Sequence, residues 1–525
     1  SRCSFNLQVS NMCLSDHYLV SFELPDKCQK DKARKPSKVV TRDIKRVDRD
    51  EFSHDVVSSF QKHVPMRASD VAESLNEALS SALDKHAPKR MSKPRVRKPD
   101  PWMTKEILAA RALRRRLESR WRTTKLTVHK EMFMDQVKAT SASIKNAKQD
   151  FYVTKLSDKR GSQRELFSAF VNLTRSSSGP QNQAATGTAD IDCANRFANY
   201  FDKKIMTIRQ HLDKCEETYK PSSRIPRTSN MVLSDFQPTT TAELEKIIRS
   251  TPVKTSTLDP IPSTLLKDVL PNILPSLVQL INYSLSTGEF PDNMKLAIIT
   301  PILKKKGADE SELKNYRPVS NLSYFSKLLE RVVAARLHSH LAASNMYYPN
   351  QSAYRPRHSV ETALLSITNS VLESFDKRDG VAMVLLDLSA AFDTIDHKIM
   401  ISRLQTVFGI QGSALSWFES YLSDRQFRVK VGSSLSDTYK LQSGVPQGSV
   451  LGPLLFSCYT YPLDEIIANH DISGHFYADD TQSWHAFSFY DSTSLAQVIT
   501  KIEHCLSDPA PGSPAVGQPY YIVRT

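Results

Sequence analysis

The chain has 525 residues, 40% of them hydrophobic and 24% charged, which argues against a broadly disordered protein and allows about two to four packed domains. Its formal net charge of +14 favours a polyanionic partner, and the excess is local, because residues 89–130 hold 15 Lys or Arg and only three acids. No apolar run is long enough to cross a membrane, and the longest, residues 268–287, is broken by Pro271 and Pro275. Seven cysteines without a C-x-x-C pair argue against a disulfide framework, a disulfide-linked partner and a zinc site.

The first half of the chain predicts short strands and then helices joined by charged linkers. Residues 5–24 are typical of two strands around a polar turn, and residues 25–48 of a linker. Helices are expected over residues 49–88, 105–122, 128–155 and 191–212. RMSKPRVRKPDP, residues 90–101, is a second linker, and the polar residues 216–238 mark a domain boundary.

From about residue 239 helical segments alternate with strand-like runs such as KLAIITPIL and VAMVLLDLS. A helix over residues 324–341 places six apolar side chains on one face, namely Phe325, Leu328, Leu329, Val332, Val333 and Leu337. A last helix around residues 495–506 runs into DPAPGSPAVGQPYY, which is rich in Pro and Gly and not expected to pack. The whole pattern predicts an α+β fold.

Two segments far apart in the sequence carry carboxylates at strand ends. FYADDTQ, residues 476–482, predicts a strand, a tight turn with Asp479 and Asp480, and a second strand. VAMVLLDLS predicts a buried strand with Asp387 at its carboxyl end. If both lie in one sheet, Asp387 and Asp479 can meet, and two Mg²⁺ ions would neutralise the crowded carboxylates. A solvated turn is the alternative explanation for FYADDTQ.

Two further features lie between these segments. Asp393 and Asp396 are expected at a helix N-terminus, where acids are favourable. LQSGVPQGSVLGPLLF, residues 441–456, predicts a loop whose glycines let its backbone approach a flat ligand, followed by a helix that starts near Val450. A plain Gly/Pro turn before a core helix is an equally open interpretation of this loop.

Taken together, D-x-S-A-A-F-D, S-G-V-P-Q-G-S-V-L-G-P and F-Y-A-D-D resemble the palm motifs of reverse transcriptases, above all those of non-LTR (LINE-like) retrotransposons. TPILKKKG (300–307) and NYRPVSNLSYFSKLLERVV (315–333) resemble the family's fingers motifs. NQSAYRPRHSVETAL (350–364) resembles its segment for nucleotide and template, with Ala-Tyr where the family often has Gly-Phe. The resemblance covers residues 240–505, about half of the chain.

This resemblance implies a right-hand polymerase with fingers and palm, an antiparallel palm sheet and a two-metal site. Asp387, Asp479 and the backbone carbonyl of Leu388 would bind two Mg²⁺ ions, with Mn²⁺ as a substitute, and Asp480 would support them. Phe392 would be the aromatic gate that rejects a ribose 2′-OH, although a plain core position is the alternative. The implied partners are an RNA template, a DNA primer or target, and dNTPs.

The same resemblance assigns residues that contact the incoming nucleotide, with Gln447 near it and basic groups on its triphosphate. The assigned basic groups are Arg317, Arg355 and Lys305, although the sequence does not choose between Lys305 and its neighbours Lys304 and Lys306. A viral RNA-dependent RNA polymerase is one alternative, and Ala478 and Phe392 argue against it. A group II intron polymerase is another, and the first residues of the chain argue against that one.

Those first residues, NMCLSDHYLVSFEL, resemble the closing Ser-Asp-His segment of an apurinic-type endonuclease domain. The resemblance implies that Asp16 would orient His17 as a general base. The other metal ligands of such a domain are absent from this chain, so no nuclease activity is expected. The chain is taken for a fragment with a missing upstream part.

The basic stretch centres on RALRRRLESRWRTTK and includes Trp102 and Trp121. The resemblance implies a surface that grips template RNA or target DNA through phosphates and stacking. A solvated helix face or a disordered linker is the alternative. The residues assigned to nucleic-acid binding are Arg114, Arg115, Arg116, Trp121 and Arg122.

The likeness fades near Ser507, where the family continues into a helical thumb, so we expect a truncated copy with weak product retention. A catalytically inactive nucleic-acid-binding remnant is the alternative function. The expected location is intracellular, in the nucleus or cytoplasm. The expected division is an endonuclease remnant at 1–24, a linker and basic helical region at 25–238, fingers and palm at 239–508, and a disordered tail at 509–525.

Overall fold

The computed structural model of the protein describes residues 6–10, 19–23, 39–61, 67–92, 102–157, 187–216 and 228–507, except 252–255 and the single residues 306, 348, 356, 389 and 492. It divides into two compact units, which are described separately: residues 1–42 with 89–181, and residues 43–88 with 182–525. Within the described residues no helix is long and apolar enough to cross a lipid bilayer.

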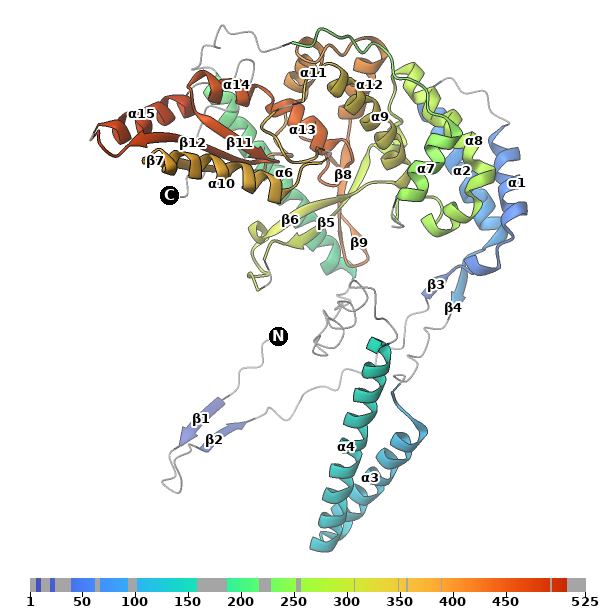
Figure 1. The fold of residues 1–525 in the computed structure, drawn as a ribbon. Coiled ribbons are helices and arrows are strands. Elements are labelled where there is room, and N and C mark those ends of the chain that lie inside the picture. Colours follow the sequence, from blue (N-terminus) through green and yellow to red (C-terminus); the bar gives the residue numbers. More distant parts are fainter. Residues whose placement is uncertain are drawn as a thin grey trace. The chain divides into compact units, whose positions relative to one another are not determined.

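The first unit combines two small antiparallel strand pairs with a helical hairpin (Figure 1). Strands β1 (Asn6–Ser10) and β2 (Leu19–Glu23) pair with each other, which confirms the two strands expected there. Strands β3 (Val39–Thr41) and β4 (Arg90–Ser92) also pair, in segments that the sequence predicted as linkers. A three-residue pair of this kind carries too little hydrophobic pattern to be recognised from sequence alone.

Helices α3 (Lys105–Thr124) and α4 (Thr127–Ser157) form the hairpin and confirm the two helices expected there. Thr104 caps α3 by accepting a hydrogen bond from the Ile107 amide, and Lys125 ends it in a left-handed conformation. The Trp121 ring stacks on Phe133 of α4, with ring centroids 5.7 Å apart. This aromatic pair holds the two helices together near the tip of the hairpin.

The second unit begins with α1 (Arg49–Phe60) and α2 (Ala68–His86), which pack against α8 (Ser263–Thr287). Glu289 follows α8 and accepts hydrogen bonds from the Ala68 amide (2.9 Å) and the Ser69 hydroxyl (3.1 Å). Although the sequence suggested that two prolines interrupt the apolar run of this region, Pro271 and Pro275 both lie inside the continuous helix α8.

Two sheets organise the rest of this unit (Figure 1). One contains β5 (Leu296–Leu303), β6 (Tyr316–Asn321), β8 (Gln426–Val431) and β10 (Tyr439–Lys440) in the order β10-β8-β5-β6, with β9 (Ser434–Leu435) paired to β8. The other is an antiparallel sheet of β7 (Asp379–Asp387), β11 (Ser473–Tyr477) and β12 (Asp480–Ser488) in the order β11-β12-β7. With the helices, these sheets confirm the α+β class.

The remaining helices pack on these sheets or on one another. They are α6 (Gly187–Glu216), α7 (Thr241–Ser250), α9 (Tyr324–Ala343), α10 (Val360–Asp376), α11 (His397–Thr406), α12 (Gly412–Leu422), α13 (Gly452–Thr460), α14 (Pro462–Asn469) and α15 (Ser494–Ser507), with the short 3₁₀ turns η1 (Ile44–Arg46), η2 (Asp292–Met294) and η3 (Leu313–Asn315). All six apolar residues predicted on one face of the helix at 324–341 are buried in the main core, as expected.

The predicted burial of the strand at 379–387 is correct for one face only. Leu386 is buried, whereas Met383 and Leu385 are 40% and 47% exposed. Alternate side chains of a strand point to opposite faces, so only one face of β7 turns toward the packed interior, with Val384 and Leu386 beside α14 and α15.

Candidate active site

The hairpin β11–β12 carries the two adjacent acids of FYADDTQ. Its loop has two residues, Ala478 and Asp479, because Tyr477 pairs directly with Asp480. Ala478 takes a positive φ of 57°, which a residue with a Cβ rarely adopts. Asp479 is half-buried and Asp480, the first residue of β12, is exposed. The predicted strand, turn and strand are therefore confirmed, with both acids at the turn.

The third acid lies at the same end of the sheet. Strands β12 and β7 are antiparallel, and their register sets Asp480 opposite Asp387 across 93 residues of sequence. Directly opposed residues of an antiparallel pair have Cα atoms about 4.5–5.5 Å apart. Backbone pairing alone therefore brings Asp387 next to the turn with Asp479. Among the side chains that the structure describes, which do not include that of Asp387, no cluster of three His, Cys, Asp or Glu is arranged to hold a metal.

The chain after β7 turns under a loop rich in glycine. Leu388 and Phe392 are half-buried against the main core, and the Phe392 ring lies 5.0 Å from that of Phe456. The Phe392 carbonyl accepts a hydrogen bond from the Val445 amide (2.8 Å). Phe392 thus has the core contacts that the alternative interpretation expects, and it remains partly exposed.

The glycines of this loop approach the protein's own backbone. Gly444 has a φ of +81°, and a Cβ there would lie 2.5 Å from the Asp393 carbonyl oxygen. Gly448 has a φ of +115°, and a Cβ there would lie 2.7 Å from the Ser320 carbonyl oxygen. Any other residue would be strained and would also clash at both positions. The loop therefore packs between β6 and the chain that follows β7.

Gln447 of this loop and Asp393 form a half-buried pair. The Gln447 Nε2 donates to the Asp393 Oδ2 at 2.7 Å. Burial raises the pKa of Asp393 to about 6, although the Gln447 hydrogen bond opposes that shift. Asp393 does not start a helix, so that prediction is wrong. Asp396 does, since its Oδ1 accepts from the amides of Lys398 and Ile399 at the start of α11.

Glu330 of α9 is a site residue that the sequence did not reveal. Its side chain is fully buried, and its Oε2 accepts from the amides of Val450 (2.6 Å) and Leu451 (3.1 Å). Its Oε1 accepts from the Ser326 hydroxyl (3.0 Å). A carboxylate at a helix N-terminus stabilises the unpaired amides there. Glu330 therefore anchors the start of α13 and the end of the glycine-rich loop.

Several cations gather on the neighbouring sheet. Arg317 pairs with Ile302 in the β5–β6 register, and the Lys304 amide donates to the Asn315 carbonyl. The pKa of Lys304 is lowered, first by burial and then by the positive charges of Lys204 and Arg317. Lys305 is exposed beside them, and Lys306 lies outside the described residues. Because these charges repel one another, the group favours an anion.

Comparison with known proteins relates this part of the chain to a protein family. Residues 302–508 match the family model described as reverse transcriptase (RNA-dependent DNA polymerase). Residues 302–508 are a reverse transcriptase domain. The polymerase motifs predicted from the sequence lie in this domain, apart from the first residues of TPILKKKG.

The chain is similar to polymerases of insect transposons. A stretch of 271 residues, 51% of this chain, is 31% identical to the probable RNA-directed DNA polymerase from transposon BS of Drosophila melanogaster and covers 29% of it. A stretch covering 69% of this chain is 27% identical to the corresponding X-element protein of that species and covers 40% of it. Half of this chain is 28% identical to the polymerase from mobile element jockey and covers 30% of it. The chain thus spans less than half the length of these relatives.

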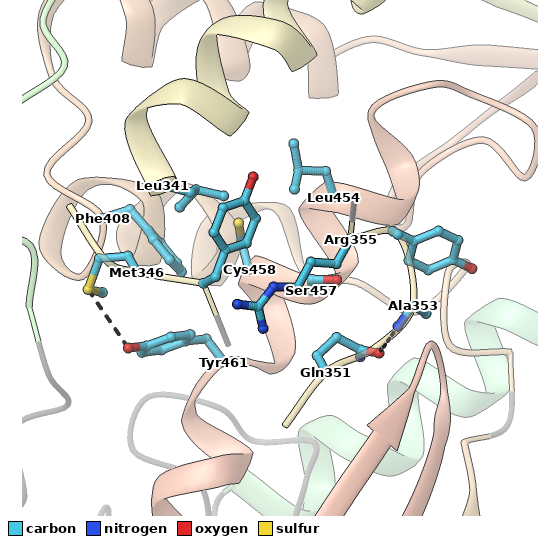
Figure 2. Close-up of a pocket in the computed structure, with 12 residues that line it drawn as sticks. Leu341, Met346, Gln351, Ala353, Arg355, Phe408, Leu454, Ser457, Cys458 and Tyr461 are labelled. Atoms are coloured by element: carbon cyan, nitrogen blue, oxygen red, sulfur yellow. Dashed lines mark hydrogen bonds between the residues drawn. The ribbon is translucent and has the colours of Figure 1, made fainter. Parts of the chain in front are cut away.

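Arg355, which the sequence predicts to contact the nucleotide, makes contacts within the protein itself. Figure 2 shows it among the side chains that line a small cavity of about 30 Å³ beside α13. Its Nη1 donates to the Pro349 carbonyl (3.3 Å), and its guanidinium lies 5.3 Å from the centre of the Tyr347 ring.

A larger cavity of about 510 Å³ is lined by residues of α9, β5, β8 and the glycine-rich loop. Its basic lining residues are Lys327, Arg331 and Lys430. The Tyr324 hydroxyl and the Arg331 Nε are buried and have no hydrogen-bond partner among the residues that the structure describes. A buried donor without a partner is costly, so these atoms favour a polar ligand or water here.

The residues predicted to bind nucleic acid outside the domain lie on α3. Arg115 and Arg116 are exposed, whereas Arg122 pairs with Glu118 (2.6 Å) and one face of Trp121 is stacked on Phe133. Arg114 is half-buried. The predicted endonuclease residues Asp16 and His17 lie outside the described residues.

Proposed function

We propose that this chain catalyses RNA-directed DNA synthesis, as a non-LTR retrotransposon polymerase with fingers and palm, by two-metal nucleotidyl transfer. In this reaction the primer 3′-OH attacks the α-phosphate of a dNTP, forming a phosphodiester bond and releasing pyrophosphate. The observation that supports it most strongly is the β7–β12 register, which sets Asp387 opposite Asp480 and beside the turn with Asp479.

The donor set fits hard divalent cations, because Mg²⁺ and Mn²⁺ prefer carboxylate and carbonyl oxygens. Asp387, Asp479 and the Leu388 carbonyl would hold two ions, and Asp480 would support them. Bound there, the ions would lower the pKa of the primer hydroxyl and stabilise charge on the reacting phosphate. The protein's own contribution is to place these oxygens at the end of a rigid antiparallel sheet.

The groups around this sheet end are proposed to bind the nucleotide. Phe392 would lie under the sugar, with Phe456 behind it to prevent retreat from a 2′-OH. Arg317 and Lys304 would bind the triphosphate. The pKa of Lys304 is lowered first by burial and then by the positive charges of Lys204 and Arg317, and an anion would relieve that repulsion. Gln447 would lie near the base, held by its hydrogen bond to Asp393.

The cavity of about 510 Å³ is proposed to take the unpaired template strand. It is large enough for a nucleotide, and Lys327, Arg331 and Lys430 offer positive charge to a phosphate. Gly448, one of its lining residues, is in the same glycine-rich loop as Gln447. Template and nucleotide would therefore approach that loop from two sides. Arg115 and Arg116 on α3 are proposed to add phosphate contacts to RNA or target DNA.

The direct test is incorporation of labelled dTTP on poly(rA)/oligo(dT) with Mg²⁺, compared between the wild-type chain and Asp479→Ala. Incorporation by the wild type that falls at least about a hundredfold in the variant is the expected result, since removing one metal ligand removes most transition-state stabilisation. A second candidate function, that of an inactive nucleic-acid binder, is supported by the basic residues of α3 alone. Tight RNA binding by the wild type without any incorporation would favour it and contradict the proposed polymerase.

A further inference from the structure

The edge of β11 that does not face β12 pairs with a short extended segment, residues 350–352, which precedes α10. The Phe476 amide donates to the Asn350 carbonyl (2.8 Å), and the Ser352 amide donates to the Phe476 carbonyl (3.0 Å). Gln351 thereby forms a parallel bridge with Phe476. Since β12 occupies the other edge of β11, strand β11 is paired on both sides.

The Gln351 side chain continues from this bridge to the tip of the hairpin. Its Oε1 accepts from the amides of Ala478 (3.0 Å) and Ala353 (3.0 Å), and its Nε2 donates to the Ala478 carbonyl (3.2 Å). Figure 2 shows the Gln351–Ala353 contact. Gln351 is only 4% exposed, so water does not compete for these bonds. One amide thus satisfies both backbone polar groups of Ala478.

Ala478 needs such support because its φ of 57° is left-handed. That conformation costs a non-glycine residue about 1–2 kcal/mol and persists only where neighbouring groups hold it. Ala478 directly precedes Asp479, so the orientation of its two peptide groups sets where the Asp479 carboxylate lies.

We infer that Gln351 is a positioning residue that fixes the Asp479 turn for metal binding, an inference that rests on the proposed function. Gln351 touches neither metal nor nucleotide and acts through Ala478. Its sequence position gives no sign of this role, because it lies 127 residues before its partner. Loss of a group that orients a metal ligand typically costs about 10–100-fold in metal affinity or activity.

The test compares Gln351→Met with Ser352→Ala in the full chain. Methionine has a similar length but forms none of the three hydrogen bonds. Ser352 is the adjacent residue, is equally buried, and binds His475 of β11 (2.9 Å) rather than the turn. We expect Gln351→Met to weaken MnCl₂ affinity, measured by electron paramagnetic resonance, at least about tenfold. We expect Ser352→Ala to change it less than twofold, with both proteins equally folded by circular dichroism.

Two further variants separate positioning from general support. Ala478→Gly added to Gln351→Met should recover part of the Mn²⁺ affinity, because glycine adopts the left-handed φ without cost. Gln351→Glu keeps the two acceptor contacts and loses the hydrogen bond donated to the Ala478 carbonyl. It should also weaken the Mn²⁺ affinity, and it provides the comparison if the methionine variant does not fold. In the primer-extension assay, Gln351→Met should lower kcat and raise the Mg²⁺ concentration that gives half-maximal rate. The KM for dTTP should change little.

Equal Mn²⁺ affinity in wild type and both Gln351 variants would overturn the inference, as would equal weakening by Ser352→Ala. These outcomes differ from failure of the proposed function. That failure would appear as absence of dTTP incorporation by the wild type, or as Mn²⁺ affinity that does not depend on Asp479.

Discussion

Replacing Glu330 with glutamine should loosen the loop that precedes α13 without changing side-chain volume. One oxygen of the carboxylate accepts from the backbone amides of Val450 and Leu451 and, at 3.4 Å, from the Tyr421 hydroxyl. The other oxygen accepts from the Ser326 hydroxyl. In Glu330→Gln the amide oxygen can still face the two backbone donors, but it carries no charge. Its NH₂ group then faces the Ser326 hydroxyl, which can accept.

The size of the effect follows from the change in acceptor. A hydrogen bond to a charged group contributes about 1.5–3 kcal/mol, and a neutral one about 0.5–1.5 kcal/mol. Two backbone donors that lose the charge therefore lose about 2 kcal/mol together, which is roughly a 30-fold change in the local opening equilibrium. Hydrogen exchange of the peptide spanning residues 441–456, read by mass spectrometry, measures this opening directly.

Glu245→Gln is the matched control. Glu245 lies on α7, and its carboxylate pairs with Arg249 one turn later on the surface. Such pairs contribute about 0.3–0.5 kcal/mol, so exchange at 441–456 should not change in the control. If Glu330→Gln left exchange at 441–456 as slow as in the wild type, the anchoring role of Glu330 would be refuted.

Four other outcomes are expected. Phe392→Ala should raise the ratio of rNTP to dNTP incorporation at least about tenfold, and an unchanged ratio would make Phe392 a core residue only. Because burial raises the pKa of Asp393 to about 6, its charge destabilises the fold increasingly as pH rises from about 4 to 6. The Tm of Asp393→Asn should therefore exceed that of the wild type at pH 8 and equal it near pH 4. A difference in Tm that is the same at both pH values would contradict this. Arg115→Ala with Arg116→Ala should reduce the slope of log RNA affinity against log salt by about one to two, and an identical slope would remove α3 from the interface. Arg331→Ala should weaken binding of primer–template with an unpaired 5′ RNA overhang but not of blunt duplex, and equal effects on both would argue against the template cavity.

The elements that depend on local pattern could be predicted from the sequence. The helix α9 has a regular apolar face, and FYADDTQ has a turn between two strand-like runs, so each was expected where it lies. The common sheet of β7 and β12 was a conditional expectation that the register confirms. Hydrophobic periodicity and turn chemistry are local signals, which is why they suffice for these elements.

Residues whose partners are remote in sequence could not be predicted. Glu330 contacts an amide 120 residues away, and Gln351 contacts a carbonyl 127 residues away. Neither residue type nor spacing marks such contacts, because a polar residue on a helix or in an extended segment usually faces water. Asp393 was expected at a helix start for a general electrostatic reason, but its burial beside Gln447 depends on how a distant loop folds back.

The measurement that tests the account most directly is primer extension on an RNA template by Asp387→Asn and Asp379→Asn. Both substitutions lie on β7, Asp387 at the end paired with Asp480 and Asp379 at the opposite end, paired with Ser488. We expect Asp387→Asn to abolish extension and Asp379→Asn to extend within about twofold of the wild type, since only the first removes a proposed metal ligand. Extension that survives Asp387→Asn, or that both substitutions abolish equally, would contradict a catalytic site at that end of the sheet.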